Sequence, residues 1–362
     1  MDLRALAIYL PQFHPVREND EWWGKGFTEW TNVTKSKARF ANHYQPQLPS
    51  DLGFYDLRVA ETRQQQADLA RQFGIHGFCY YHYWFNGRRI LETPFEEVLN
   101  SSEPDFPFCL CWANENWTRR WDGEDKQVLL QQNYSEDDDR EHIRSLASAF
   151  KDSRYIKVDG KPVFIVYRIN ALPDPKRTTD IWRDEARKLG IGELYLMRME
   201  ISTHGIDPIS QGLDSAIEFQ PDWPNLPQRE YGSWKDRALN RLRLKASPFW
   251  QDIVVDYRKV SQSMMGRARP KYKLFPGVAP NFDNSPRRAT NATIFVESSP
   301  EKYEEWLQHV VDTFVPYSKD ENFIFINAWN EWAEGNHLEP CRKWGIKYLQ
   351  ATAKALGFQN KK

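Results

Sequence analysis

Short apolar runs, each of strand length, recur along the chain and are separated by longer stretches with helical spacing. The apolar runs cover residues 5–10, 77–84, 106–112, 162–167, 193–199, 215–219, 273–279 and 323–328. The helical stretches lie at 57–73, 136–151, 179–189, 208–213, 248–265, 300–314 and 343–356. Strands that alternate with helices indicate a parallel sheet, and eight such units predict a single (β/α)8 TIM-type barrel. An open, doubly wound sheet is the alternative.

Three connections are longer than this repeat requires, namely about 11–53, 112–134 and 222–244. Each follows a predicted strand, so in a barrel all three would lie on the rim formed by the carboxyl ends of the strands. Long connections in compact domains are usually functional. We therefore expect residues 1–362 to form one catalytic domain whose active rim carries these loops.

Charge and hydropathy narrow the class of protein. Lys and Arg number 49 against 50 Asp and Glu, a net charge of -1, which argues against binding nucleic acid through bulk charge. No stretch approaches the ~20 apolar residues of a transmembrane helix, and the chain begins without a long apolar signal core. A soluble cytoplasmic protein is expected. The basic stretch 229–245 is either a solvated helix face or a peripheral contact with a membrane surface.

No metal or cofactor is expected. Cys79, Cys109, Cys111 and Cys341 fall in or near apolar runs and are predicted to be buried free thiols, because one Cys-X-Cys pair is a weak zinc signal. The chain's 15 Trp residues allow two interpretations, core packing and platforms that stack on sugar rings.

Polar and aromatic residues gather just past the predicted strands. Carboxylates, amides, His, Tyr and Trp from separate segments would converge on one rim, which describes a carbohydrate site. The residues expected to contact substrate are Glu29, Trp30, Tyr81, His82, Trp84, Trp112, Asn114, Glu115, Tyr167, Asp283, Asn330 and Trp332.

Glu331 and Glu334 are the predicted catalytic residues. Cleavage of a glycosidic bond needs one protonated and one ionised carboxyl group, and a spacing of three on a helical turn places two carboxyls on one face, ~5–6 Å apart at Cβ. Repulsion between them would raise one pKa and leave one acid and one base at neutral pH. Glu115 is the alternative partner, facing Glu331 across the barrel mouth.

Several motifs resemble those of a known family. Residues 330–335, Asn-Glu-Trp-Ala-Glu-Gly, resemble the signature of glycoside hydrolase family 99, the endo-α-1,2-mannosidases and mannanases. With residues 7–15, 26–33, 77–84 and 112–117, the chain looks closer still to the WbsX-like proteins of bacterial O-antigen and other surface-polysaccharide clusters, often labelled glycosyltransferases.

The resemblance implies a (β/α)8 barrel, catalysis without metal and retention of anomeric configuration. It also implies that Glu331 deprotonates the substrate's 2-hydroxyl to give a 1,2-anhydro sugar, while Glu334 acts as acid and then base. The leading hypothesis is a retaining glycoside hydrolase that cleaves an α-linkage in a bacterial surface polysaccharide or its precursor. The alternatives are a glycosyltransferase, a transglycosylase using the same carboxylates, and an inactive sugar-binding barrel. The sugar, the linkage and the oligomeric state stay open.

Overall fold

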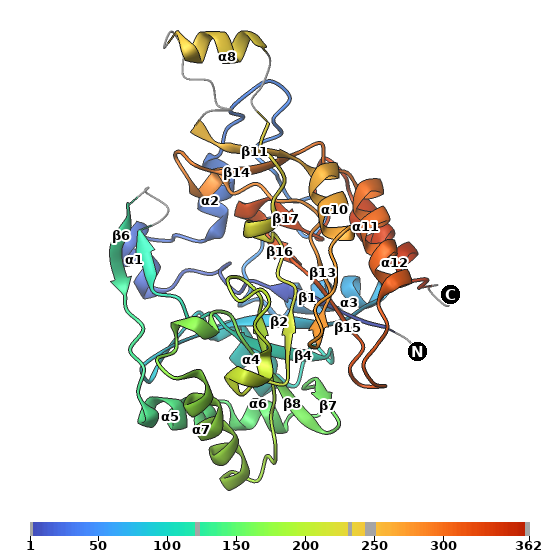
Figure 1. The fold of residues 1–362 in the computed structure, drawn as a ribbon. Helices are drawn as coiled ribbons and strands as arrows, with labels where there is room; N and C mark the ends of the chain where they lie inside the picture. Colours follow the sequence, from blue (N-terminus) through green and yellow to red (C-terminus); the bar gives the residue numbers. More distant parts are fainter. Residues whose placement is uncertain (1–2, 120–123, 231–233, 243–250, 359–362) are drawn as a thin grey trace.

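The computed structural model describes residues 3–119, 124–230, 234–242 and 251–358. Parallel strands form the central sheet (Figure 1). Their order in the sheet is β12-β10-β9-β8-β4-β2-β1-β15-β13. Their bounds are β1 Arg4–Tyr9, β2 Ile75–Phe85, β4 Phe108–Trp112, β8 Lys161–Val166, β9 Tyr195–Met199, β10 Ser215–Ile217, β12 Leu274–Phe275, β13 Gly277–Val278 and β15 Phe323–Ile326. All eight apolar runs of the sequence lie on this path, so the predicted (β/α)8 barrel is confirmed and the open sheet is excluded.

The seventh strand closes the barrel in two pieces. β12 pairs with β10, whereas β13 pairs with β15, and only Pro276 separates the two pieces. Proline has no N–H to give to a sheet, but its carbonyl still accepts from the N–H of Phe325 at 2.9 Å. The chain therefore changes its hydrogen-bonding partner at this residue and joins the two ends of the sheet.

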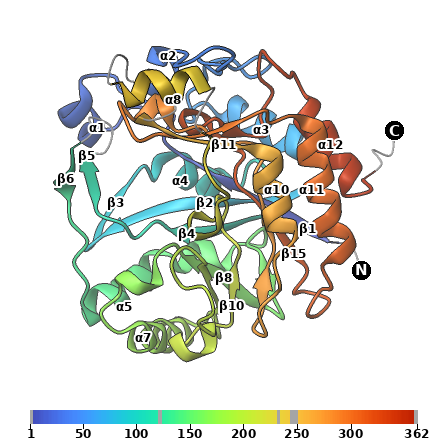
Figure 2. The ribbon, with the colours of Figure 1, turned by 45° about the horizontal axis from the view of Figure 1, so that its top comes forward.

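Helices cover the outside of the barrel (Figure 2). They are α3 Ala60–Gln72, α4 Thr93–Ser101, α5 Glu136–Ser145, α6 Ala147–Lys151, α7 Pro175–Lys188, α10 Tyr257–Met265, α11 Pro300–Thr313 and α12 Lys347–Ala355, with the 3-10 turn η3 Pro208–Gln211. Local sequence sets several of their starts: the side chains of Asp174 and Ser299 each accept from the backbone N–H three residues on, and each residue precedes a proline at the first helical position.

The sequence prediction differs from the structure in three places. The segment expected as one helix at 248–265 contains the strand β11 Ile253–Asp256 before α10, and β11 pairs with β14 Thr293–Val296. The run Ile253-Val-Val is β-branched, which favours a strand. The predicted helix 136–151 breaks at Leu146, and α4 was not predicted.

The long connections carry their own elements. Residues 11–53 contain α1 Arg17–Trp23 and α2 Glu29–Lys35, and 112–134 contain the hairpin β5 Trp117–Arg119 and β6 Glu124–Leu130. Residues 222–244 contain η4 Trp223–Asn225 and α8 Trp234–Arg241. The short strands β3 Arg88–Ile90 and β7 Lys157–Val158 pair antiparallel with β2 and β8, and η2 Ile169–Ala171 follows β8. Residues 231–233 and 243–245 of the basic stretch lie outside the described residues.

The interior is apolar and packed. Residues of every barrel strand belong to one buried cluster, which includes large side chains such as Trp182 and Trp306 beneath the helices. The four cysteines are buried and free, as predicted. Within the described part of the chain, no helix is both long enough and apolar enough to cross a bilayer.

Candidate active site

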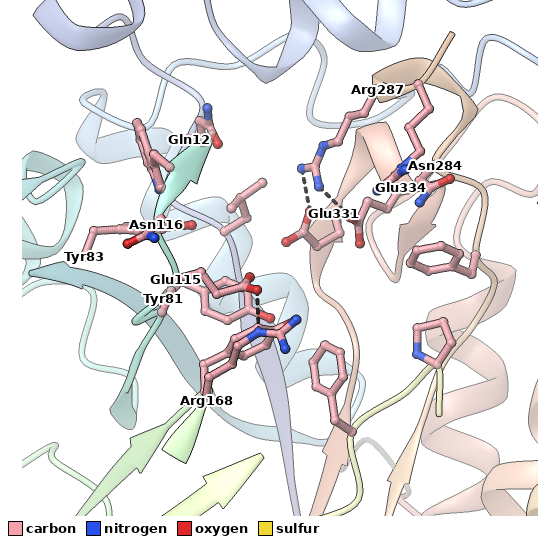
Figure 3. Close-up of a pocket in the computed structure, with 18 of the residues that line it drawn as sticks. Gln12, Tyr81, Tyr83, Glu115, Asn116, Arg168, Asn284, Arg287, Glu331 and Glu334 are labelled. Atoms are coloured by element: carbon pink, nitrogen blue, oxygen red, sulfur yellow. Dashed lines mark hydrogen bonds and ion pairs between the residues drawn. The ribbon is translucent and has the colours of Figure 1, made fainter. Parts of the chain in front are cut away.

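A cavity of about 490 Å³ opens at the carboxyl ends of the strands (Figure 3). Its wall combines aromatic rings with a small number of charged groups, as carbohydrate and other small-molecule sites do. The lining residues are Leu10, Gln12, Trp23, Tyr81, Tyr83, Ala113, Glu115, Asn116, Trp117, Leu129, Tyr167, Arg168, Phe219, Pro221, Trp223, Phe282, Asn284, Arg287, Arg288, Glu331 and Glu334. They come from the ends of six barrel strands and from all three long connections.

Glu331 and Glu334 lie side by side on one wall. Asn330 and Glu331 form the short strand β16, which pairs with β17 Asn336–His337, and the 3-10 turn η6 Trp332–Glu334 joins them. Gly335 ends the turn at φ 56°, a left-handed conformation that glycine adopts without strain. This tight loop brings both carboxylates to the cavity within five residues of chain.

Arg287 holds the two carboxylates together. Its Nη2 donates to Glu331 Oε2 at 2.8 Å and its Nη1 to Glu334 Oε1 at 2.7 Å (Figure 3). Its Nε also donates to Glu29 Oε1 at 2.8 Å, and Glu29 is fully buried behind it. One guanidinium from the connection after the seventh strand therefore bonds carboxylates from two other connections, those after the first and eighth strands. Arginine suits this task because its donors form a rigid planar fork.

The two catalytic candidates differ in exposure and electrostatics. The Glu331 side chain is 8% exposed and that of Glu334 is 25% exposed. Burial raises the pKa of Glu331 to about 8, repulsion from Glu334 and Glu29 adds to the shift, and Arg287 opposes it. Burial also raises the pKa of Glu29. Glu331 is thus the deep carboxyl that holds a proton near neutral pH, and Glu334 is the one nearer to solvent.

Glu115 and Arg168 form an ion pair on the opposite wall (Figure 3). Asn114 fixes the Arg168 backbone from behind, because its Oδ1 accepts from the Arg168 N–H at 2.7 Å and its Nδ2 donates to the Arg168 carbonyl at 2.8 Å. The predicted placement of Glu115 across the mouth from Glu331 agrees with this arrangement.

Side chains of β2 alternate between the cavity and the outer layer. Tyr81 and Tyr83 line the cavity. His82 and Trp84 point the other way, where His82 Nε2 lies 2.9 Å from His142 Nε2 and Trp84 Nε1 donates to Asp138 at 3.0 Å. This follows from the two-residue period of a strand. Burial raises the pKa of Tyr81, so its hydroxyl stays a neutral donor.

The predicted substrate ligands thus divide into two groups. Tyr81, Glu115 and Tyr167 line the cavity together with Glu331 and Glu334. The others lie behind its wall and support it; these are Glu29, Trp30, His82, Trp84, Trp112, Asn114, Asp283, Asn330 and Trp332. Their contact with a substrate stays a prediction that this arrangement does not favour.

The supporting residues fix the loop that carries Glu331 and Glu334 through buried hydrogen bonds. The Asn330 side chain bonds both backbone groups of Leu10, at 2.7 and 3.0 Å. Glu339 accepts from Trp332 Nε1 at 2.6 Å and from Tyr55 at 2.8 Å. Burial raises the pKa of Glu339 to about 7. Polar groups so well bonded hold the loop in one conformation.

The sequence analysis missed several residues of the cavity wall, Arg287 above all. After the seventh strand the sequence analysis named only Asp283, and Arg287 follows four residues later in η5 Ser285–Arg287. The run Asn284-Ser-Pro-Arg-Arg288, five residues beyond the predicted strand 273–279, was the available signal. Among the described residues, no group of three or more His, Cys, Asp or Glu side chains is arranged to hold a metal ion.

Comparison with known proteins places the chain in a family. The profile of the family described as Glycosyltransferase WbsX matches residues 5–352. Uncharacterized WxcX proteins from two strains of Xanthomonas campestris pv. campestris are 42% identical over 352 residues, covering 97% of this chain. The chain spans about half the length of these relatives, 49%.

Solved structures share the fold at low identity. A glycoside hydrolase-like protein matches with a TM-score of 0.57 and 13% identity, over 98% of this chain and 94% of that one. The GH99 endo-α-mannosidase from Bacteroides thetaiotaomicron also matches with a TM-score of 0.57 and 13% identity, over 98% and 96% of the two chains. These matches show the fold.

Proposed function

The chain belongs to the WbsX glycosyltransferase family, and from this membership we propose that it is a carbohydrate-active enzyme that cleaves an α-glycosidic bond with retention. The observation that carries the proposal is the Glu331–Glu334 pair, bridged by Arg287 and open to an aromatic cavity. The substrate would be a bacterial surface polysaccharide or its precursor, and transfer to another sugar in place of water would use the same groups.

The two exposures support a division of roles. The deep carboxylate of Glu331 would take the proton of the substrate's 2-hydroxyl, and the 2-oxygen would attack the anomeric carbon as the bond to the departing sugar breaks. Glu334, nearer to solvent, would protonate the departing oxygen. Water then opens the 1,2-anhydro ring: Glu334 accepts a proton from that water, and Glu331 returns its proton to the 2-oxygen. A raised pKa makes the Glu331 carboxylate a stronger base. It therefore narrows the difference in pKa between this carboxyl group and the sugar hydroxyl that gives up its proton.

The pH profile of kcat/KM tests the role of Glu331. On a glycoside with a good leaving group, which departs without an acid, Glu331 must be ionised as the base, so kcat/KM should rise with pH through a limb near pH 8 and level off above it. The profile would be measured from about pH 5 to about pH 10, with Glu115→Gln as a variant expected to keep the limb. A profile that falls through pH 8 on this activated substrate would contradict Glu331 as the base.

The decisive assay separates hydrolase from transferase. Purified protein is incubated with bacterial O-polysaccharides and α-linked mannans, without nucleotide sugar, while NMR follows reducing ends and product anomers. We expect products of retained configuration, absent with Glu334→Gln. If no polysaccharide of the panel is cleaved, and turnover occurs when an activated donor is supplied, the transferase is favoured.

One observation weighs against a donor site of the Asp-X-Asp kind at 137–139. The side chain of Asp137 is fully exposed, whereas Asp139 is buried and accepts from Thr178 at 3.0 Å. Two carboxylates that point to different surroundings cannot share one cation. Asp137 and Asp139 belong to the first turn of α5, where acidic side chains are stabilised by the helix dipole.

Helix α8 gives the proposed membrane contact a physical basis. It stands away from the body of the protein (Figure 1). Trp234 is 74% exposed on it and Leu242, just beyond it, is 65% exposed, with Lys235 and Arg241 also exposed. Apolar side chains beside cations are typical of segments that lie in the interface of an anionic bilayer.

Vesicle sedimentation tests this contact. The protein should bind phosphatidylglycerol vesicles and leave phosphatidylcholine vesicles unbound, and Trp234→Ala with Leu242→Ser should lose most of the binding. Val315→Ser is the matched control, since Val315 is equally exposed on another surface. Equal binding by all three proteins would exclude α8 as the contact.

A further inference from the structure

A second cavity of about 210 Å³ lies directly behind the wall that carries Glu334. It is lined by residues 40–44 and Gln47 of the first connection, by residues after the seventh strand, and by Gly335, His337, Lys343, Trp344 and Tyr348. None of the catalytic candidates lines it. It is smaller than the roughly 300 Å³ lower bound of drug-sized pockets and far larger than the about 30 Å³ share of one water molecule.

The two cavities share a wall one chain thick. In the extended segment 281–284, Phe282 and Asn284 line the first cavity, while Asn281 and Asp283 line the second. The same alternation occurs in the loop of residues 330–335, where Glu334 lines the first cavity and Gly335 lines the second. Successive side chains of an extended segment point to opposite sides, so one backbone serves both spaces.

Hydrogen bonds across this wall connect the second cavity to the catalytic loop. The Asp283 N–H donates to the Glu334 carbonyl at 2.6 Å, and Asn281 Nδ2 donates to the Gly335 carbonyl at 3.0 Å. The Asp283 carboxylate is held in turn by His43 Nε2 at 2.7 Å and Gln45 Nε2 at 2.6 Å. A ligand of the second cavity would therefore contact residues that are hydrogen-bonded to the backbone of Glu334 and Gly335.

The lining has the groups that recognise a pyranose. Tyr44 and Trp344 offer aromatic rings, and the Lys343 ammonium lies 5.0 and 4.9 Å from their centroids. Asn281 is 9% exposed, and its Oδ1 has no hydrogen-bond partner among the described residues. A buried acceptor without a partner destabilises the protein, and a ligand that donates to it removes that cost. A sugar hydroxyl can donate to it while the apolar face of the ring contacts the aromatic groups.

We propose that this second cavity binds one pyranose unit of a glycan, as a site separate from the catalytic cavity. Resting on the proposed function, its occupant would be a further unit of the polymeric substrate or of a neighbouring chain. A polymer held at both places would bind more tightly than a short fragment, because the second contact is made within one complex.

Saturation-transfer NMR on the full chain tests binding directly. The probes are the methyl glycosides of α-mannose, α-rhamnose, β-glucose and β-galactose. We expect at least one to bind, with affinity severalfold lower in Tyr44→Ala and in Trp344→Ala, since each variant loses one aromatic platform for the sugar ring. Trp223→Ala, an equally exposed aromatic residue of the catalytic cavity, is the matched control and should keep this binding.

The proposal is overturned if no glycoside binds, if Trp344→Ala binds as the wild type does, or if Trp223→Ala alone removes all binding. Circular dichroism and thermal melting confirm that each variant is folded. A second readout uses turnover: Trp344→Ala should raise KM for the polymer severalfold and leave kcat, and KM for a short oligosaccharide, unchanged. If no turnover occurs at all, the proposed function fails while the binding result still decides the second cavity.

Discussion

Glu331→Gln and Glu334→Gln are each expected to lower kcat on the natural linkage by about 10²–10⁴-fold, the usual contribution of a positioned acid or base. Glutamine keeps the size of the side chain and one acceptor oxygen for Arg287, so the fold and the affinity for oligosaccharide should change little. Turnover of purified variants, alongside melting curves and ligand binding, checks both expectations. Glu115→Gln is the comparison for a carboxylate in the same cavity.

An activated substrate distinguishes the two roles. A glycoside with a good leaving group, such as a nitrophenyl glycoside, departs without help from an acid. On such a substrate Glu334→Gln should recover much of its activity, whereas Glu331→Gln should stay inactive because the 2-hydroxyl still needs a base. Full activity of both variants on the natural linkage would show that the assignment is wrong and would move attention to Glu115.

Arg287→Met is expected to reduce stability by about 3–5 kcal/mol and to abolish turnover, because it leaves buried carboxylates without a countercharge. Glu29 loses its cationic partner, while Glu331 and Glu334 lose the fork that sets their relative orientation. With the cation gone, the pKa of Glu331 would rise further above its present value of about 8. Thermal melting and kcat measure the two losses.

Arg287→Lys and a double variant make this prediction sharper. Lysine keeps the charge without the planar fork, so Arg287→Lys should retain part of the stability but little of the activity. Adding Glu29→Gln to Arg287→Met removes one unpaired charge and should restore part of the lost stability, a coupling that a double-mutant cycle measures. An Arg287→Met protein that melts like the wild type would contradict the role of Arg287 as a clamp, that is, as the cation that holds Glu29, Glu331 and Glu334 together.

Strand-length apolar runs were enough to predict the barrel, because each barrel strand is buried on both faces and reads as a continuous run. The carboxyl ends of those runs also located Glu331, Glu334, Tyr81 and Tyr167 on one rim. The break at Pro276 and the strand β11 were not predicted, since both depend on pairing with segments distant in the sequence.

The site list could not separate residues of the cavity wall from residues behind it, for a similar reason. Trp84 and Trp112 looked like sugar platforms, yet they face the helices, and the Trp112 N–H donates to the Trp84 carbonyl at 3.2 Å. The two-residue period of β2 could have separated Tyr81 and Tyr83 from His82 and Trp84. Nothing local could have revealed Arg287 as a partner of Glu29, because the two are 258 residues apart.

The clamp formed by Arg287 has a consequence for inhibitors. Many sugar mimics carry a basic nitrogen and gain affinity by placing a cation between two carboxylates. Here an internal guanidinium already occupies that position between Glu331 and Glu334, so a charged ligand must compete with a cation that is part of the protein. Neutral compounds that reproduce the flattened ring of the reacting sugar would avoid this competition, and they are the better starting point for a tight ligand.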